Sequence, residues 1–263
     1  MPRLLLIIVA ACASCSPTPH PVEIRFDVRL NGEPVSCTRD AGGVRLNDLR
    51  FYVTDVRLRD GAGDWQPMTI IADDTWQNDV LALIDLEDGE GACQNGTPEQ
   101  NAVLRGTVAT APGTGVAFTI GVPEQLNHAD PLTADAPLAY TVMHWHWASG
   151  YKFLRAGVET DDDSFFLHLG SNRCAGTIGN IEGCQGANRV TAELTDFNAG
   201  ENVIVIDVGT LFADVDLQNS AASECMSGPA NNDCIAPFAA LGIDFSSGEA
   251  SSQVPAISAG PTK

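Results

Sequence analysis

Apolar and polar residues alternate with a period of two along most of this chain. In residues 23–30, apolar side chains alternate with charged ones, and an Asn-Gly turn follows. This alternation is typical of a strand with one buried face. Residues 49–58 continue the pattern, but their apolar positions change parity near residues 54–55, which predicts a bulge or a corner there. A turn is expected at residues 60–63.

Further segments have the same character. They are residues 80–86, 103–108, 116–122, 140–147, 153–158, 164–169, 190–194 and 203–208. Gly, Asn, Asp and Pro turns separate them, and no segment has the period of a long amphipathic helix. Short helices are expected near residues 98–104 and 214–223. The pattern therefore predicts an all-β protein, an antiparallel β-sandwich or barrel-like domain with disulfides and few short helices.

The first fifteen residues differ from the rest of the chain. They contain one arginine, a short apolar run and small residues before a cysteine, which is typical of a bacterial export signal. The run is too short for a permanent membrane span. Residues 9–12 resemble a lipobox, so Cys12 is the first candidate for lipidation and Cys15 the second. Cleavage after Ala13 is a further alternative.

These features predict a location and a division of the chain. The protein is expected to be periplasmic or anchored to the outer membrane by a lipid. The expected segments are a signal peptide with lipobox (1–15), a tether (16–21), a single β-rich metal-binding domain (22–245) and a flexible C-terminal tail (246–263).

The chain is strongly acidic. It has 34 Asp and Glu residues against 14 Lys and Arg residues, a net charge of −20. Loss of the signal removes Arg3 and leaves 13 basic residues, for a net charge of −21. A nucleic-acid partner is excluded, because its phosphates would be repelled. Cations, metal ions and basic protein surfaces remain as partners.

Six cysteines lie beyond the signal. An even number in an exported chain without a CxxC pair indicates disulfides rather than thiolate metal sites. Sequence alone does not fix their connectivity. The short spacings suggest Cys174–Cys184 and Cys225–Cys234 as local pairs and leave Cys37–Cys93 as the long one.

Residues 143–153, MHWHWASGYKF, gather scarce residue types. If they are extended, His144 and His146 share one face, and Trp145 and Trp147 share the other. Two such imidazoles can bind one metal ion, and imidazole suits copper, zinc, iron and nickel. An isolated HxH is more often a solvated edge strand. The concentration of histidine and tryptophan here favours a metal site.

Two other histidines are candidate ligands. His168 lies in the second strand of a predicted hairpin whose loop is residues 160–163, and it shares a face with Phe166. A lone histidine among apolar residues is usually a core residue, but this hairpin directly follows the HxH segment. His128 lies in the preceding loop, and loops often carry ligands. Three or four imidazoles would favour copper or zinc over calcium or magnesium.

Other kinds of site receive less support. The acidic run at residues 159–163 lacks the spacing of an EF-hand and is expected to be a solvated hairpin tip. The motifs GxSxG and HExxH and a phosphate-binding loop are absent. Two alternatives stay open. One is a copper or non-haem iron oxidoreductase that uses the same histidines. The other is a disulfide-linked β-sandwich that binds a protein or glycan through Trp65, Trp76, Trp145 and Trp147.

Four segments together resemble the MbnP family, the four-Cys proteins of the so-called metallo-mystery pair. They are LNDLRFYVTDVRL, GVPEQLNHADPLTADAPL, MHWHWASGYKFLRAGVE and FFLHLGSNRCAG. The resemblance covers most of the exported chain. It implies a secreted, mainly β, methanobactin-associated protein that binds copper in copper homeostasis. It also implies a partner, a di-haem cytochrome of the MauG type (MbnH-like), which oxidises a tryptophan to kynurenine in characterised relatives.

The resemblance also assigns roles to individual residues. His128 and His168 match the family's histidine positions, and Trp145 and Trp147 match its tryptophan pair, either of which is a candidate for oxidation. His144 and His146 depart from the family's pattern and are either additional ligands or a local variation. By this reading the protein is not an enzyme but the substrate of a haem enzyme.

The four-Cys name corresponds to four of the six cysteines. These are Cys37, Cys93, Cys174 and Cys184, so Cys225 and Cys234 are an addition in this chain.

Overall fold

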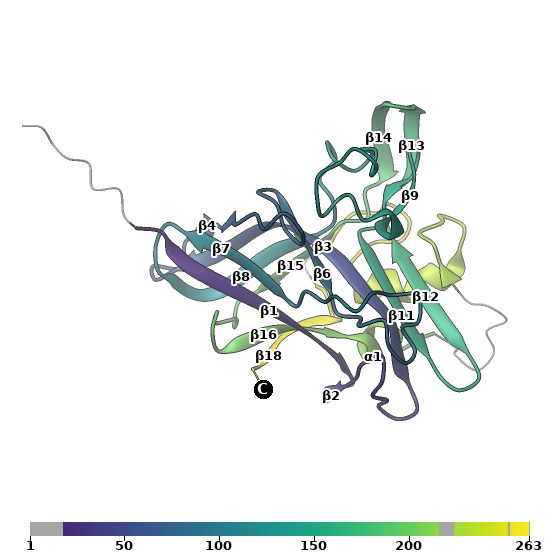
Figure 1. Ribbon diagram of the computed structural model, residues 1–263, viewed down its shortest axis with the longest axis horizontal. Coiled ribbons are helices and arrows are strands. Elements are labelled where there is room, and N and C mark those ends of the chain that lie inside the picture. Colours follow the sequence, from purple (N-terminus) through teal and green to yellow (C-terminus); the bar gives the residue numbers. More distant parts are fainter. Residues whose placement is uncertain (1–17, 216–223, 252, 263) are drawn as a thin grey trace, which may run out of the picture.

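The computed structural model describes residues 18–215, 224–251 and 253–262. Mixed β-sheets form a half-barrel, so the prediction of a strand-rich, sandwich or barrel-like fold is confirmed (Figure 1). The sheets are not purely antiparallel. β1 (His20–Leu30) pairs in parallel with β16 (Asn202–Asp207), and β12 (Ser164–Leu169) pairs in parallel with β17 (Glu224–Cys225).

A six-stranded sheet forms one wall. Its order is β18 (Ile257–Pro261), β16, β1, β7 (Val103–Val108) and β5 (Thr69–Ile70), with β2 (Glu33–Pro34) beside β1. β18 corrects the expectation of a flexible tail from residue 246 onward, because it pairs antiparallel with β16 along its whole length. Its backbone hydrogen bonds, which the sequence does not reveal, order this otherwise small and polar segment.

An eight-stranded sheet forms the other wall. Its order is β15 (Val190–Leu194), β8 (Pro112–Ile120), β3 (Arg45–Asp60), β11 (Leu154–Glu159), β12 and β17, with β4 (Trp65–Pro67) and β6 (Leu81–Asp85) also on β3. The register between β3 and β8 shifts between Thr54 and Arg57, and Asp55 has a positive φ of 49°. The bulge predicted at residues 54–55 is confirmed.

In residues 18–215, 224–251 and 253–262, helices are few and short. They are α1 (Val208–Leu211), α2 (Ile235–Ala240) and the 3-10 helices η1 (Thr141–Met143) and η2 (Asn232–Cys234). The helix expected at residues 98–104 is wrong, because Ala102 accepts a hydrogen bond from Phe26 and β7 begins at Val103. The helix expected at residues 214–223 lies mostly outside the described residues. In the described part of the chain, no helix is long and apolar enough to cross a membrane.

One apolar core joins the two walls. The alternating side chains of β1 supply Ile24 and Phe26, which are 1% and 5% exposed. The Phe26 ring meets the rings of Phe51 and Phe118 edge-on, with centroids 5.4 Å and 6.0 Å apart. Burial of each such side chain stabilises the fold by roughly 1.5–3 kcal/mol.

A second apolar cluster lies on the outer side of β3 and β6. Its buried members are Tyr52, Leu81, Leu83, Val122, Leu138, Met143, Tyr151 and Phe153. The Tyr52 hydroxyl donates to Pro137 O at 3.2 Å, and the Tyr151 hydroxyl donates to Leu138 O at 2.7 Å. These bonds hold the segment before the HWH sequence against the sheet.

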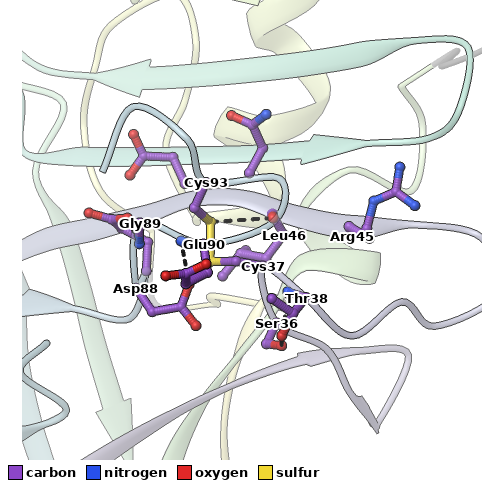
Figure 2. Close-up of a disulfide and its surroundings, with 12 residues drawn as sticks. Ser36, Cys37, Thr38, Arg45, Leu46, Asp88, Gly89, Glu90 and Cys93 are labelled. Carbon is purple, nitrogen blue, oxygen red and sulfur yellow. Dashed lines mark hydrogen bonds between the residues drawn. A yellow bond between two sulfur atoms is a disulfide. The ribbon is translucent and has the colours of Figure 1, made fainter. Parts of the chain in front are cut away.

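The three disulfides have the pairing that the spacings suggested: Cys37–Cys93, Cys174–Cys184 and Cys225–Cys234. Figure 2 shows Cys37–Cys93 beside the turn at residues 88–90. Ala92 N donates to Cys37 O at 2.9 Å, and both cysteines are 1% exposed. This bridge therefore fastens the loop after β6 to the loop between β2 and β3.

Loss of the longest bridge should cost the most stability. Cys37 and Cys93 are 56 residues apart, whereas Cys225 and Cys234 are 9 apart. In the chain-entropy model the Cys37→Ser/Cys93→Ser variant loses about 4 kcal/mol, and the Cys225→Ser/Cys234→Ser variant loses about 3 kcal/mol. Urea unfolding of both variants measures the difference, and an equal or reversed loss would contradict the loop-length explanation.

Candidate metal centre

The HWH segment forms a small ribbon. β9 (His144–His146) pairs antiparallel with β10 (Gly150–Tyr151), which places Tyr151 opposite His144. The strand expected at residues 140–147 is therefore shorter and is preceded by η1. Gly150 has a φ of +72°, and a Cβ there would lie 2.3 Å from Asn127 O. A glycine is required because the ribbon packs directly on the loop that contains Asn127.

Asn127 connects three segments and was not identified from the sequence. It is fully buried, and the Tyr151 N–H bonds to both its Oδ1 and its backbone O at 3.1 Å. Its Nδ2 donates to Ser171 Oγ at 2.8 Å. The LNH motif therefore positions the ribbon through Asn127 as well as supplying a histidine. A buried amide in a loop gives no periodic signal in the sequence.

His128 is held in one orientation. Its Nδ1 lies 2.8 Å from Trp147 O, and since a carbonyl only accepts, Nδ1 carries the proton. Asn127 Nδ2 can only donate, so His128 Nε2, which lies 3.2 Å from it, accepts and carries the lone pair. Nε2 also lies 3.4 Å from Cys184 Sγ. Donation of one ring N–H to a backbone carbonyl is the usual way in which a metal-binding histidine is oriented.

The two histidines of the HWH segment have different surroundings. His146 is exposed, with Nδ1 accepting from Ala148 N at 3.3 Å and Nε2 lying 3.0 Å from Ser149 Oγ. The His144 ring lies edge-on to the Tyr151 ring, with centroids 4.9 Å apart. Its Nε2 is buried and has no hydrogen-bond partner among the described residues. Burial, with a smaller contribution from Lys152, lowers the pKa of His144.

His168 has the same unusual property on a different strand. It lies on β12 opposite Arg155, and its Nε2 is also buried without a partner in the described part of the chain. Burial first, then the charges of Arg155 and Lys152, lower the pKa of His168 to about 3. Both His144 and His168 are therefore neutral at physiological pH.

The segment around His144 lies against the end of β12. Lys152 Nζ donates to Val142 O at 2.7 Å and to His144 O at 3.4 Å. A Cβ on Gly170 would lie 2.5 Å from Cζ3 of Trp145, so this indole packs directly on the backbone two residues beyond His168. These contacts associate His144, Trp145 and His168 with one region of the surface.

The structure does not gather all four predicted histidines into one cluster. Among the described residues, the one group of three or more His, Cys, Asp or Glu side chains that contains a histidine and has its ligand atoms within 4.8 Å of one another is His128 with Cys174 and Cys184. A second group, Cys37 with Asp88 and Cys93, contains sulfurs bonded to each other in a buried disulfide (Figure 2). A copper site of three or four imidazoles stays a prediction.

The four tryptophans are held by separate contacts. The Arg59 guanidinium lies 4.5 Å above Trp65, and Trp76 stacks on Tyr140 at 5.5 Å. Trp145 packs on Gly170, whereas the side chain of Trp147 is 39% exposed. Trp147 is thus the most accessible of the four to a partner.

Comparison with known proteins places the chain in a family. The MbnP family model matches residues 19–227. The chain belongs to the MbnP family. The solved structure of MbnP from Methylosinus trichosporium superposes with a TM-score of 0.82 at 27% sequence identity, covering 94% of this chain and all of the other. A search of curated proteins found no match. Neither the match to the family model nor the match to the solved structure indicates a catalytic activity.

A row of ionisable, largely buried residues crosses the sheet of this MbnP-family chain, starting at the candidate ligand His168. Cross-strand pairing places His168 beside Arg155, Arg155 beside Arg50, and Arg50 beside Asp85, along β12, β11, β3 and β6. This row was not predicted from the sequence. The hint in the sequence is Arg50, a charged residue within an apolar stretch that is typical of a buried strand.

Asp48 is the anion that both arginines share. Its Oδ2 lies 2.8 Å from Arg50 and 2.7 Å from Arg155, and all three side chains are largely buried. Glu87, which is fully buried, contacts the other side of Arg50 at 3.3 Å. Arg155, which lies next to His168, and Arg50, one strand further, are therefore both fixed by ion pairs.

Asp85, at the end of the row, should make stability depend on pH. Burial raises its pKa from 3.8 to about 8. Between pH ~4 and pH ~8 the folded protein keeps a proton on Asp85 that the unfolded chain releases. The contribution of Asp85 to the free energy of unfolding therefore falls as the pH rises toward 8. Asp85→Asn should match the wild type at pH 4 and exceed its unfolding free energy at pH 8.

Unfolding in urea at a series of pH values measures this effect. Asp79→Asn is the matched control, because Asp79 is exposed. Parallel pH curves for Asp85→Asn and the wild type would contradict the assignment of a buried, protonated carboxyl group.

Proposed function

We propose that this MbnP-family protein binds copper outside the cytoplasm and takes part in copper handling. The supporting observation is the pair of buried, unpartnered Nε2 atoms on His144 and His168. A buried polar atom without a partner costs roughly 1–3 kcal/mol, so such atoms point to a missing ion or water. Both rings are held neutral, and neutral imidazole is the form that binds metals.

The donor set fits copper. Imidazole nitrogen is a favoured copper ligand, and we assign His144 and His168 as the ligands because their Nε2 atoms have no hydrogen bond to exchange. His128 and His146 remain candidates, but their ring nitrogens already have hydrogen-bond partners that would have to be exchanged. When bound, copper would supply a one-electron redox couple at this position.

The cations nearest the proposed ligands favour the lower oxidation state, although Asp48 offsets part of the charge of Arg155. Arg155 and Lys152 act on His168 as cations, and Lys152 Nζ also reaches His144 O. Repulsion from fixed cations rises with the charge of the bound ion, so these residues disfavour Cu(II) more than Cu(I). We therefore assign the site to Cu(I).

We further propose that a di-haem MauG-type enzyme converts Trp145 or Trp147 to kynurenine. Indole is readily oxidised, and Trp147 is exposed, whereas Trp145 follows His144 in the chain and packs on Gly170. Modification of Trp145 would place a new amine and ketone beside the proposed ligands. The net charge of −20 would steer association with a less acidic partner.

Export and lipid attachment complete the proposal. The signal peptide and its candidate lipidation residues, Cys12 and Cys15, lie outside the described residues. Attachment at either would hold the copper site at the outer membrane, whereas cleavage after Ala13 would leave the protein free in the periplasm.

Peptide mass spectrometry tests the modification. The protein is purified from its native host and from the same host without the haem enzyme. The expected result is the mass gain of kynurenine on the peptide that contains Trp145 and Trp147, only when the enzyme is present; fragmentation then assigns the residue. An unmodified peptide from both hosts would refute the proposed modification.

A further inference from the structure

The Cys174–Cys184 disulfide differs from the other two in its accessibility. It joins directly opposed residues of β13 (Asn172–Thr177) and β14 (Asn180–Gly186), a hairpin that stands out from the body (Figure 1). Both cysteines are partly exposed, whereas the cysteines of the other disulfides are at most 1% exposed. The base of the hairpin is tied down, because Asn172 Nδ2 donates to Ser227 O at 2.7 Å.

His128 presents its lone pair to this disulfide. Its proton lies on Nδ1, facing Trp147 O, so the unprotonated Nε2 faces Cys184 Sγ at 3.4 Å. Nε2 and both sulfurs lie within 4.8 Å of one another. In a tetrahedral site with bonds of about 2.3 Å to sulfur and about 2.0 Å to nitrogen, two ligand atoms lie roughly 3.5 Å apart. The observed separation of nitrogen and sulfur is therefore that of one coordination edge.

A cleft of about 570 Å³ gives cations a route to His128. It lies between the 124–130 loop and the hairpin tip, and its lining includes Glu124, Asp130 and Glu182. Carboxylates at the mouth of a cleft raise the local concentration of cations. Metal ions would thus be attracted to the side of the disulfide that His128 occupies.

We propose that reduction of Cys174–Cys184 creates a second metal site, formed by the two thiolates and His128 Nε2, for a soft ion such as Cu(I). A dithiol reductant gives two electrons and two protons to the disulfide and becomes a disulfide itself. The two cysteine thiols then release their protons to solvent as they bind the metal. Thiolate ligands select Cu(I) and zinc over harder ions. Asn127 Nδ2 gives up its bond to Nε2 but keeps its bond to Ser171 Oγ.

This site uses neither His144 nor His168, so it is tested in the His144→Ala/His168→Ala variant of the full chain. After mild anaerobic reduction, one aliquot is alkylated and analysed by mass spectrometry, which should identify Cys174 and Cys184 as the thiols that reduction releases. Cu(I) competition titration of a second, unalkylated aliquot should show one more copper bound per chain than in the variant with this disulfide intact. Co(II) added to the reduced protein should give a thiolate-to-metal charge-transfer band.

Two further substitutions assign the ligands. Cys174→Ser/Cys184→Ser in the same background should abolish the gain in copper, and His128→Ala should lower the affinity for Cu(I) at least about tenfold. The proposal is overturned if both thiols are free and no additional copper binds. It is also overturned if the Co(II) spectrum of the chain with native His128 lacks the charge-transfer band, or if His128→Ala binds Cu(I) with unchanged affinity. Copper binding by the oxidised wild type is a separate test of the proposed function.

Discussion

Replacement of His168 with alanine should lower the affinity for Cu(I) at least about 100-fold in the protein with its disulfides intact. This is the upper end of the loss caused by removing a residue that only supports a metal ligand. The reason is that His168 offers a buried, neutral and unpartnered Nε2, so its removal deletes a ligand and not a supporting contact. His144→Ala should have an effect of the same size. Competition titration against a chromophoric Cu(I) chelator measures both affinities.

His146→Ala is the matched control for this result. His146 is exposed and both of its ring nitrogens have hydrogen-bond contacts, so its loss should change the copper affinity little. Folding of every variant is checked by urea unfolding. Wild-type affinity in a folded His168→Ala protein would show that this imidazole does not hold the metal.

Replacement of Asp48 with alanine should destabilise the protein by about 3–5 kcal/mol, the cost of breaking a buried ion pair by removing one partner. Asp48 is 3% exposed and contacts both Arg50 and Arg155 within 2.8 Å. Its removal leaves Arg155 without its carboxylate partner and Arg50 with Glu87 alone. The midpoint and slope of urea unfolding measure the change.

Glu193→Ala is the control for the effect of burial. Glu193 pairs with Arg59 at 3.3 Å, but its side chain is 49% exposed. Loss of an exposed pair should cost at most about 1 kcal/mol. If Asp48→Ala and Glu193→Ala cost the same, the buried row would have no special role in stability.

Strands whose burial follows local alternation could be predicted from the sequence. Ile24 and Phe26 are core residues, as are Phe165 and Leu167, while His168 lies on the opposite face of β12 as expected. The parity change near Thr54 correctly marked a bulge, because a bulge turns the following side chains to the other face.

Elements that depend on a distant partner could not be predicted in this way. The β13–β14 hairpin is rich in glycine and exposed on most positions, so its residues carry no apolar period. β18 follows a polar segment and is ordered by β16. The helix expected at residues 98–104 failed because pairing with β1 outweighed the local preference.

The candidate site was predictable as a set of residue types but not as a geometry. The sequence identified His128, His144, His146 and His168 as candidates. It could not show that Nε2 of His144 and His168 lacks a partner, or that His128 faces a disulfide, because these properties depend on contacts between distant segments. The positions of Arg155 beside His168 and of Arg50 beside Arg155 also depend on pairing between distant strands.

X-ray absorption at the copper edge tests the central claim most directly. The copper-loaded wild type, with its disulfides intact, is compared with the His144→Ala/His168→Ala variant. The expected result is imidazole scattering around a single Cu(I) in the wild type and loss of both the bound copper and this signal in the variant. Copper retained by the folded double variant with an unchanged spectrum, or a wild-type spectrum without imidazole scattering, would contradict the account.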